Sequence, residues 1–497
     1  MPLNAATWWT FMIRARHLTL CAVVALTVAL AGQSPFDRRD GEALSRSILE
    51  GDRTFQVLRE LTSTFGPRLA GSPAYEGAAQ WAARQFRAAG LENVALEPFV
   101  IQRGWQRVSA SGRLVSPEAL PLHIQSLGWM PSTPEGGMEA EVATVADLAP
   151  ERIASQASLK GRIALVGSLG AGDAFERATR QHRLDERLRA AGAIAMLSVE
   201  EEPGSALSAR SLDDRADVGV LPAAQVSRDE AQAIRRLLDR GPVRVAIDIR
   251  NRITPGPVTV HNVVAEIRGR DRPDEWVIVG AHLDSWDFAT GAQDNGTGVA
   301  QVLASARAIM ALGRSPRRSI RFALWGAEEL GLVGSAAYVR AHAAEMARCT
   351  ASLNTDGGTG RVLGWTAPGR ADVASAMRPL ASALLTDLGS AALDQSLRYA
   401  FQSDAGPFIL AGVPSLDLNP DDAEYEQIHH KATDSLERVN ARNLAVGAAT
   451  VAVTAFAIAD APMPLAPHVD ERAVAAIVAA SRMDGVLQLM GLWQPAP

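Results

Sequence analysis

Three apolar runs in the middle of the chain constrain its fold more than any other feature. VHNVVAEI (260–267), EWVIVGAHL (275–283) and SIRFALWG (319–326) each predict a buried strand, and 297–313 predicts a helix between the last two. The apolar residues of that helix share one face: Val299, Val302, Leu303, Ala306 and Met310. Alternating strands and helices predict an α/β fold with a mixed, largely parallel central sheet flanked by helices.

Residue patterns divide the chain into five segments, of which residues 1–31 are the first. Residues 36–118 and 257–461 carry the longer helical and strand patterns and are expected to form one catalytic domain. Between them, residues 119–256 contain short β-rich runs separated by glycine, proline and charged residues, which predicts an inserted module. Residues 462–497 form a proline-containing tail with one short amphipathic helix, whose role the sequence does not reveal.

The first 31 residues resemble a secretory signal. Arg14 and Arg16 precede the apolar run LTLCAVVALTVAL, and Ala29-Leu30-Ala31 supplies the small residues of a cleavage site. We expect cleavage after Ala31 and a secreted or periplasmic protein with no membrane anchor. Because Cys21 lies within this segment, Cys349 is the one cysteine of the mature chain, and no internal disulfide is expected.

The charge balance bears on the choice of partner. The net charge is −6, and the sequence has no long Lys/Arg cluster. A phosphate backbone would be repelled, so nucleic acid is an unsuitable partner and small molecules or peptides are favoured.

Histidines and carboxylates follow the predicted strands at the points where the strands end. His282 and Asp284 end the second apolar run, and Asp294 and Asn295 precede the following helix, which either of them could simply cap. In open α/β sheets, ligands bind at the carboxyl ends of the strands.

The same pattern recurs further along the chain. Glu328 and Glu329 follow the third run, and Asp356 ends a further run within ASLNTDGG (351–358). The loop IHHKATDS (428–435) adds His429, His430 and Asp434. Each alone has a structural explanation as a helix cap, a dipole complement or a core histidine. Four such groups after successive elements instead predict a site for a cation that takes nitrogen and oxygen ligands, of the zinc type.

At these residues the sequence resembles a known family, the co-catalytic di-zinc exopeptidases, and within it the carboxypeptidase Q group. The motifs occur in family order: FGPRLAGSPAYEGAAQWA (65–82), HLDSWD (282–287), GAQDN (291–295), WGAEELGLVGS (325–335), NTDGG (354–358) and HHKATDS (429–435). The inserted segment resembles a protease-associated domain. The resemblance covers nearly the whole mature chain.

The resemblance implies a role for each matching residue. One zinc ion would be held by His282 and Asp356 and the other by Glu329 and His430, with Asp294 bridging the two. Cobalt or manganese could replace zinc.

Further roles are implied around these ligands. Glu328 would be the general base, Asp284 would orient the ring of His282, and Asp434 would orient His430. Many relatives have a tyrosine where this chain has His429. We interpret His429 as a hydrogen-bond donor to the oxyanion of the reaction and not as a metal ligand.

Asp404, in SDAGPFILAGVP (403–414), either contacts a substrate amine or caps a helix. His123 and His182 of the insert are isolated and are expected to be structural or exposed.

The predicted function is hydrolysis of terminal peptide bonds in short peptides or dipeptides by water activated at the metal pair. Two alternatives remain: a single-zinc acyltransferase of the glutaminyl cyclase kind, and a silent binding protein of the transferrin-receptor kind. Retention of both His282 and Asp356 favours two ions. The resemblance also suggests a homodimer.

Overall fold

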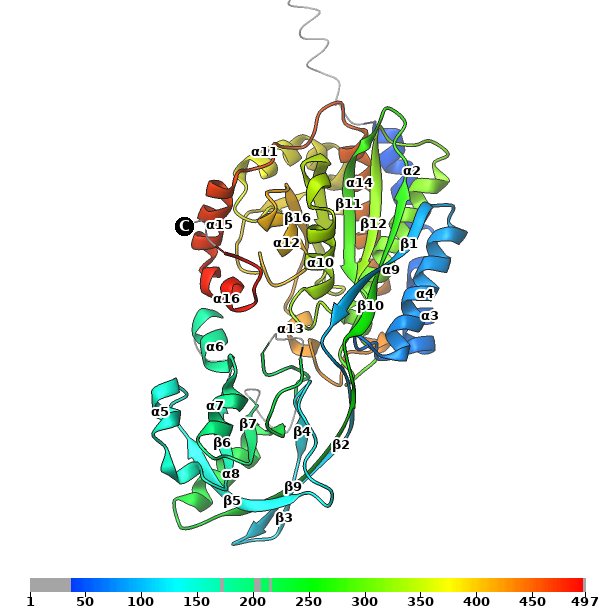
Figure 1. Ribbon diagram of the computed structural model, residues 1–497. Coiled ribbons are helices and arrows are strands. Elements are labelled where there is room, and N and C mark those ends of the chain that lie inside the picture. Colours follow the sequence, from blue (N-terminus) through cyan, green and yellow to red (C-terminus); the bar gives the residue numbers. More distant parts are fainter. Residues whose placement is uncertain (1–36, 170–173, 201–206, 214–216, 495–497) are drawn as a thin grey trace, which may run out of the picture.

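The computed structural model describes residues 37–169, 174–200, 207–213 and 217–494, so the expected signal segment lies outside the described residues. Figure 1 shows two bodies. The larger one, here called the main body, is built around a central sheet that helices cover on both faces. The smaller one, here called the insert, contains a second sheet and is joined to the main body by the long strands β2 (Gly104–Ser116) and β9 (Arg244–Thr254).

The central sheet has eight strands in the order β1-β10-β12-β11-β13-β16-β14-β15. The strands β11, β12, β13 and β16 run parallel to their neighbours in that group, and β14 runs parallel to β15, whereas the pairs β1/β10, β10/β12 and β14/β16 are antiparallel. The predicted mixed sheet is therefore confirmed. Its strands are β1 (Glu92–Ile101), β10 (Val258–Ile267), β11 (Arg272–His282), β12 (Arg318–Trp325), β13 (Cys349–Asn354), β14 (Val362–Thr366), β15 (Ala392–Asp394) and β16 (Ser415–Pro420).

Helix α4 of the main body begins at a side-chain cap that its sequence supplies. Ser72 accepts a hydrogen bond from the Tyr75 N–H at the start of α4, and Pro73 occupies the first helical turn. The helices are α2 (Arg38–Leu49), α3 (Arg53–Phe65), α4 (Pro73–Ala88), α9 (Thr297–Ala311), α10 (Val333–Ala341), α11 (Ala371–Leu380), α12 (Ala405–Leu410), α13 (Tyr425–Ile428), α14 (Ala441–Asp460), α15 (Glu471–Ser481) and α16 (Asp484–Leu489).

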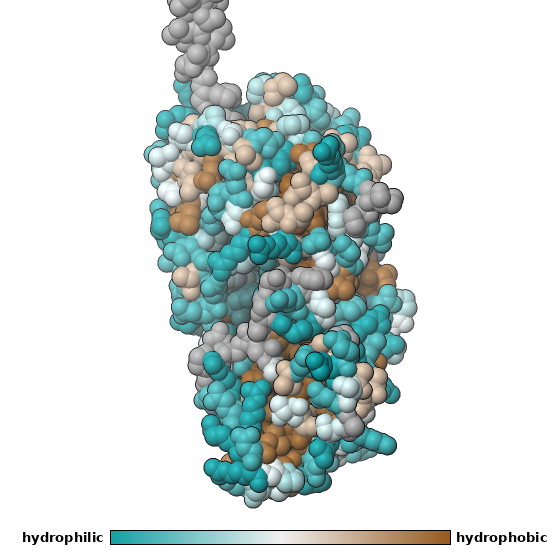
Figure 2. All heavy atoms as spheres, turned by 90° about the vertical axis from the view of Figure 1, so that its left-hand side faces the viewer, coloured by the Kyte–Doolittle hydropathy of each residue, from teal (hydrophilic) through white to brown (hydrophobic). Residues whose placement is uncertain are grey.

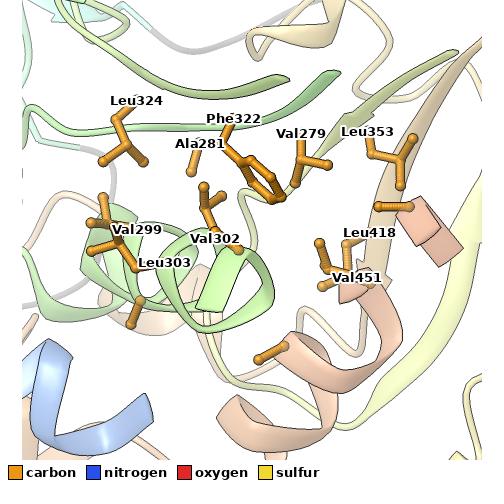
Figure 3. Packing of buried hydrophobic residues seen from close by; sticks show 14 of the residues in the cluster. Val279, Ala281, Val299, Val302, Leu303, Phe322, Leu324, Leu353, Leu418 and Val451 are labelled. Atoms are coloured by element: carbon orange, nitrogen blue, oxygen red, sulfur yellow. The ribbon is translucent and has the colours of Figure 1, made fainter. Parts of the chain in front are cut away.

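The main core lies between the sheet and helices α9 and α14. Figure 3 shows Val279, Ala281, Phe322, Leu324 and Leu353 of the sheet lying opposite residues of these two helices. Helix α9 is buried on almost all sides and not only on its predicted apolar face, because α14 covers it as well. The Ser305 hydroxyl on α9 therefore donates to the Ala448 carbonyl of α14 at 3.0 Å instead of meeting water.

Helix α14 is long and apolar enough to cross a membrane by length and composition alone. In this fold 83% of its most apolar window is buried inside the protein, against α9 and α2. Its composition is thus explained by the core that it completes.

The insert is an α/β module and not only a set of β-rich runs. Its sheet has the order β3-β2-β9-β5-β6-β7-β8-β4, and β5 to β8 are parallel neighbours. Strand β2, which lies before the expected boundary at 119, belongs to this sheet. Its elements are β2 (Gly104–Ser116), β3 (Leu120–Leu122), β4 (Ile124–Ser126), β5 (Met138–Val145), α5 (Pro150–Ala154), β6 (Ile163–Ser168), α6 (Ala174–Gln181), α7 (Leu184–Ala190), β7 (Ala195–Val199), β8 (Ala223–Val226), α8 (Arg228–Leu238) and β9 (Arg244–Thr254).

The C-terminal tail packs onto the main body and reaches the insert. Val478 of α15 and Leu487 of α16 are buried against Phe401 and Ile409, and α16 also contacts α6. On the face that carries the tail, hydrophobic residues form separate patches among hydrophilic ones (Figure 2). The tail therefore supports helix α12 and the turn that precedes it.

Candidate functional site

The parallel strands at the centre of the sheet bring the predicted site residues together. In β11, His282 pairs in register with Trp325 of β12, and Gly280 pairs with Asn354 of β13. The loops that follow these strands therefore leave the same edge, and they carry Glu328, Glu329 and Asp356. The remaining two ligand candidates come from the loop before α9 and the loop before α14. We call His282, Asp294, Glu329, Asp356 and His430 the central cluster.

Asp294 lies at the middle of the central cluster. Its Oδ1 is 3.2 Å from His282 Nε2, and its Oδ2 is 3.2 Å from His430 Nε2. On the His282 side, Asp356 Oδ1 is 3.4 Å from the same Nε2. Ligands of a tetrahedral zinc ion with bonds of 2.0–2.1 Å lie about 3.3 Å apart. The two oxygens of one carboxylate thus face two separate groups of donor atoms at ligand spacing.

Two oxygen atoms of the cluster support a cation site independently. Glu329 Oε1 and Asp356 Oδ1 are buried without a hydrogen-bond partner, although Glu329 Oε2 is 2.9 Å from His430 Nε2. Unpaired buried carboxylate oxygens are costly unless a cation is near. The residues present therefore fit a pair of zinc-type ions.

The electrostatics reflect the same crowding of charge. Burial would lower the pKa of His282, but the nearby charges of Asp356 and Glu328 raise it well above its usual range. Burial raises the pKa of Glu329 to about 7, with His430 opposing the shift. Burial would likewise raise the pKa of Asp294, but its hydrogen bonds with the two histidines lower it well below its usual range.

Glu328 lies beside the cluster, as a general base requires. Its Oε2 is 4.0 Å from His282 Nε2, and 11% of its side chain remains exposed. Burial raises its pKa well above the usual range, which favours proton uptake. The preceding Ala327 has φ of 56°, a conformation that non-glycine residues rarely adopt and that is found at functional sites.

Asp284 holds the loop of the two glutamates more than the ring of His282. Its Oδ1 and Oδ2 accept hydrogen bonds from the N–H groups of Glu328 and Glu329 at 3.2 and 3.4 Å. His282 Nδ1 is 3.1 Å from the backbone carbonyl of Asp284 and 3.7 Å from its carboxylate. The orienting partner of the ring is thus mainly the carbonyl.

Asp434 does not hold His430, contrary to the expectation from sequence. Its Oδ1 and Oδ2 accept from the N–H groups of Gln293 and Asp294 at 2.6 and 3.2 Å. Asn295, and not Asp294, caps α9, since its Oδ1 accepts from the Gly298 N–H at 3.0 Å. The carboxylate of Asp294 is thereby left to face the histidines.

His429 lies next to the cluster but is turned partly outward. Its Nε2 is 3.6 Å from Asp294 Oδ2, close enough for it to be a possible ligand together with His430. Its ring stacks on that of His430 with centroids 3.7 Å apart, and 45% of its side chain is exposed. Desolvation and the charge of His430 lower its pKa below the usual range, so it is neutral near pH 7.

Asp404 does not cap the helix that follows it. Its side chain makes no capping hydrogen bond to α12, so it is not a helix cap, and it is 1% exposed, so its contact with a substrate amine stays a prediction. Burial raises its pKa to about 8, opposed by the charge of His282 and the hydroxyl of Ser335. Asp404 lies behind the site. In the insert, His123 is exposed and His182 partly buried, and neither belongs to a metal-type group.

Sequence reasoning missed Arg68 as a functional support. Its guanidinium is fully buried and donates to the carbonyls of Leu283, Thr290 and Gly291 at 2.8–2.9 Å, and also to that of Gly66 at 2.9 Å. It thus clamps the loop between His282 and Asp294. An arginine in a loop carries no periodic signal, and its partners are backbone atoms, so only the tertiary structure reveals it.

A cavity of about 470 Å³ opens beside the cluster. Asp356 and His429 border it on the cluster side, and Asn354 and Asp417 also line it. The Ser403 hydroxyl donates to Asp356 Oδ2 at 2.7 Å and accepts from Asn354 Nδ2 at 2.9 Å. The volume of this cavity is typical of pockets that hold small ligands.

The insert touches the cluster directly. The N–H of Ala209 donates to the carbonyl of His430 at 2.6 Å, and Ser208 pairs with Lys431 as an isolated antiparallel bridge. Trp129 of the insert packs against Trp286, whose ring in turn meets that of His430 edge-on.

Comparison with known proteins agrees with this arrangement. Residues 262–455, which contain the whole central cluster, match the model of peptidase family M28. Carboxypeptidase Q of Mus musculus is 32% identical over 415 residues, 82% of this chain and 86% of its own length. This chain belongs to peptidase family M28.

Solved structures give the same result for the fold. A peptidase M28 precursor from Shewanella amazonensis superposes with a TM-score of 0.73 at 28% identity, covering 87% of this M28 peptidase chain and 99% of its own. A zinc aminopeptidase from Bacillus subtilis superposes with a TM-score of 0.63 at 24% identity, covering 81% and 94%. The assignment of the insert as a protease-associated domain stays a prediction.

Proposed function

We propose that this protein is an exported exopeptidase that uses two zinc ions to hydrolyse terminal peptide bonds of short peptides or dipeptides. The observation that carries the proposal is the position of Asp294, whose two oxygens each lie 3.2 Å from a different histidine. Zinc is named because the donors are imidazole and carboxylate, and because the Bacillus subtilis relative is a zinc aminopeptidase.

The residues divide into two ligand groups. His282 and Asp356 would hold one ion, Glu329 and His430 the other, and Asp294 both. When bound, such ions polarise the scissile carbonyl and bring the pKa of water from 15.7 to about 7. Manganese or cobalt would suit the same donors.

The protein's own groups then move the proton and place the substrate. Glu328, whose backbone N–H is fixed by Asp284, accepts the proton of the attacking water and passes it to the leaving amine. His429 is neutral and faces the cavity, so its ring N–H can donate to the developing oxyanion.

Metal analysis combined with dipeptide hydrolysis tests the proposal. Two equivalents of zinc and cleavage that chelation abolishes would support it. One equivalent with cyclisation of N-terminal glutamine would favour the cyclase alternative, and no metal with no hydrolysis would favour a silent binding protein.

Glu328→Gln separates catalysis from metal binding. The amide cannot accept the proton, so we expect kcat to fall roughly 10²–10⁴-fold while both metal equivalents remain. Glu329→Gln is the matched control, since it should lose one equivalent instead. Normal turnover in Glu328→Gln would assign the base elsewhere.

Export and assembly are tested separately. Intact mass of secreted protein should show a chain that begins at Gly32, and a mature chain that retains Met1 would contradict the signal. Light scattering should give twice the chain mass if the protein is a homodimer.

A further inference from the structure

The cavity beside the central cluster has an acidic floor within the sheet. Asp417 lies on β16, in register with Asn354 of β13 and Thr366 of β14, so its position is set by strands on both sides. Its Oδ1 accepts from Asn354 Nδ2 at 3.2 Å. Groups carried by sheet strands are held more rigidly than groups on loops.

Asn354 lies beside this carboxylate and holds it in place. It is 3% exposed, and its Nδ2 donates to both Ser403 and Asp417. Because its Oδ1 is buried as well, the acceptor that the cavity wall offers to a guest is the carboxylate of Asp417.

The rim does not offset this negative floor. Among the described residues that line the cavity, Arg398 is the only arginine or lysine. Its guanidinium is already paired with Asp422 at 3.4 Å and with Glu426 at 2.7 Å. The Tyr399 hydroxyl donates to the same two carboxylates at 3.3 and 3.2 Å. The rim is therefore neutral or negative, and Asp417 keeps its charge uncompensated.

We propose that this cavity is a subsite for a positively charged side chain, with Asp417 as its anchor, so that the enzyme prefers peptides in which lysine or arginine is the residue next to the scissile bond on that side. This inference rests on the proposed peptidase function. A long stem with a terminal ammonium or guanidinium matches a cavity of about 470 Å³ that has a carboxylate in its lining. The contact is a charge-assisted hydrogen bond in a partly desolvated place.

Dipeptides test the subsite whichever terminus of the peptide the enzyme recognises. At pH 8, we compare kcat/KM for Lys-Ala with Met-Ala, and for Ala-Lys with Ala-Met, because methionine has a similar length without the charge. One of the two pairs should favour lysine by about 10- to 100-fold, the range of a hydrogen bond to a charged group. Free L-lysine should also inhibit more strongly than L-norleucine.

Asp417→Asn keeps the shape of the side chain and removes its charge. In the pair that favours lysine, it should bring the ratio of kcat/KM for the lysine dipeptide to kcat/KM for the methionine dipeptide to within about 3-fold of one. Asp387→Asn, an exposed aspartate with 84% of its side chain in solvent, is the matched control and should leave the ratio unchanged. Equal cleavage of both dipeptides in each pair, or an unchanged ratio in Asp417→Asn, would overturn the subsite alone. If none of the four dipeptides is cleaved by the metal-loaded enzyme, the proposed function itself fails.

Discussion

Arg68 offers the sharpest test of how the fold holds the site. We expect Arg68→Met to destabilise the metal-loaded protein by about 3–5 kcal/mol and to weaken metal retention. The reason is that its guanidinium is the donor for carbonyls on both sides of the loop between His282 and Asp294, at Leu283 and Gly291. Without it, these buried acceptors lose their partner and the loop loses its fixed path.

The magnitude follows from two opposing effects. Four hydrogen bonds from a charged donor contribute roughly 1.5–3 kcal/mol each, or roughly 6–12 kcal/mol together. Burial of the guanidinium lowers the pKa of Arg68 to about 10 although the charges of Asp434 and Asp284 oppose the shift, so desolvation offsets part of this gain. Water that enters the space in the variant recovers part of the loss, so we expect the lower end of the difference, as for other broken buried charge contacts.

Thermal unfolding and metal content after dialysis measure both effects. Arg68→Lys keeps the charge but has a single nitrogen that cannot span four carbonyls, so it should recover only part of the stability. Arg84→Met on α4 removes an exposed arginine and should change unfolding by less than about 0.5 kcal/mol. If Arg68→Met unfolds like Arg84→Met and retains both metal equivalents, the clamp has no energetic role.

Two further variants test other supports of the site. Ala209→Pro removes the N–H that donates to the His430 carbonyl, so one of the two proposed metal equivalents should be lost faster on dialysis. Ala209→Gly keeps the N–H and should retain both equivalents. Equal metal loss from the two variants would show that this hydrogen bond does not support the metal site. Burial raises the pKa of Asp417 to about 7 from 3.8. Its ionisation therefore leaves the free energy of folding unchanged below about pH 4 and destabilises the folded protein fully above about pH 7. Asp417→Asn should therefore raise the melting temperature at pH 8 and not at pH 4, and a gain that is independent of pH would contradict this assignment.

The parts of the site that the sequence predicts are those with a local signal. Long apolar runs predict β10, β11 and β12, and polar residues directly after such runs predict where His282 and Glu329 meet. The signal is strong because parallel strands share one edge, so sequence order translates into spatial proximity. Cys349 is buried with a free thiol, as expected for a lone cysteine.

The parts that the sequence does not predict depend on backbone partners far along the chain. The motif around Asp434 suggests a contact with an imidazole, but this carboxylate accepts from two amides about 140 residues away. The motif around Asp404 suggests a substrate contact, and only the fold shows that the residue is enclosed. Asp417 sits within a short strand, where one polar residue in an alternating pattern normally faces water.

These distant contacts explain why the central cluster should be sensitive to the whole fold. The backbone around Asp294 is fixed by Asp434, and the backbone of His430 is fixed by Ala209 of the insert. The N–H of Ala209 therefore links the insert to the backbone of one of the proposed ligands. A cation that binds this arrangement and not the undocked one stabilises the docking by the same free energy. We therefore expect variants of Ala209 to change metal retention without replacing a ligand, which is what the dialysis of Ala209→Pro measures.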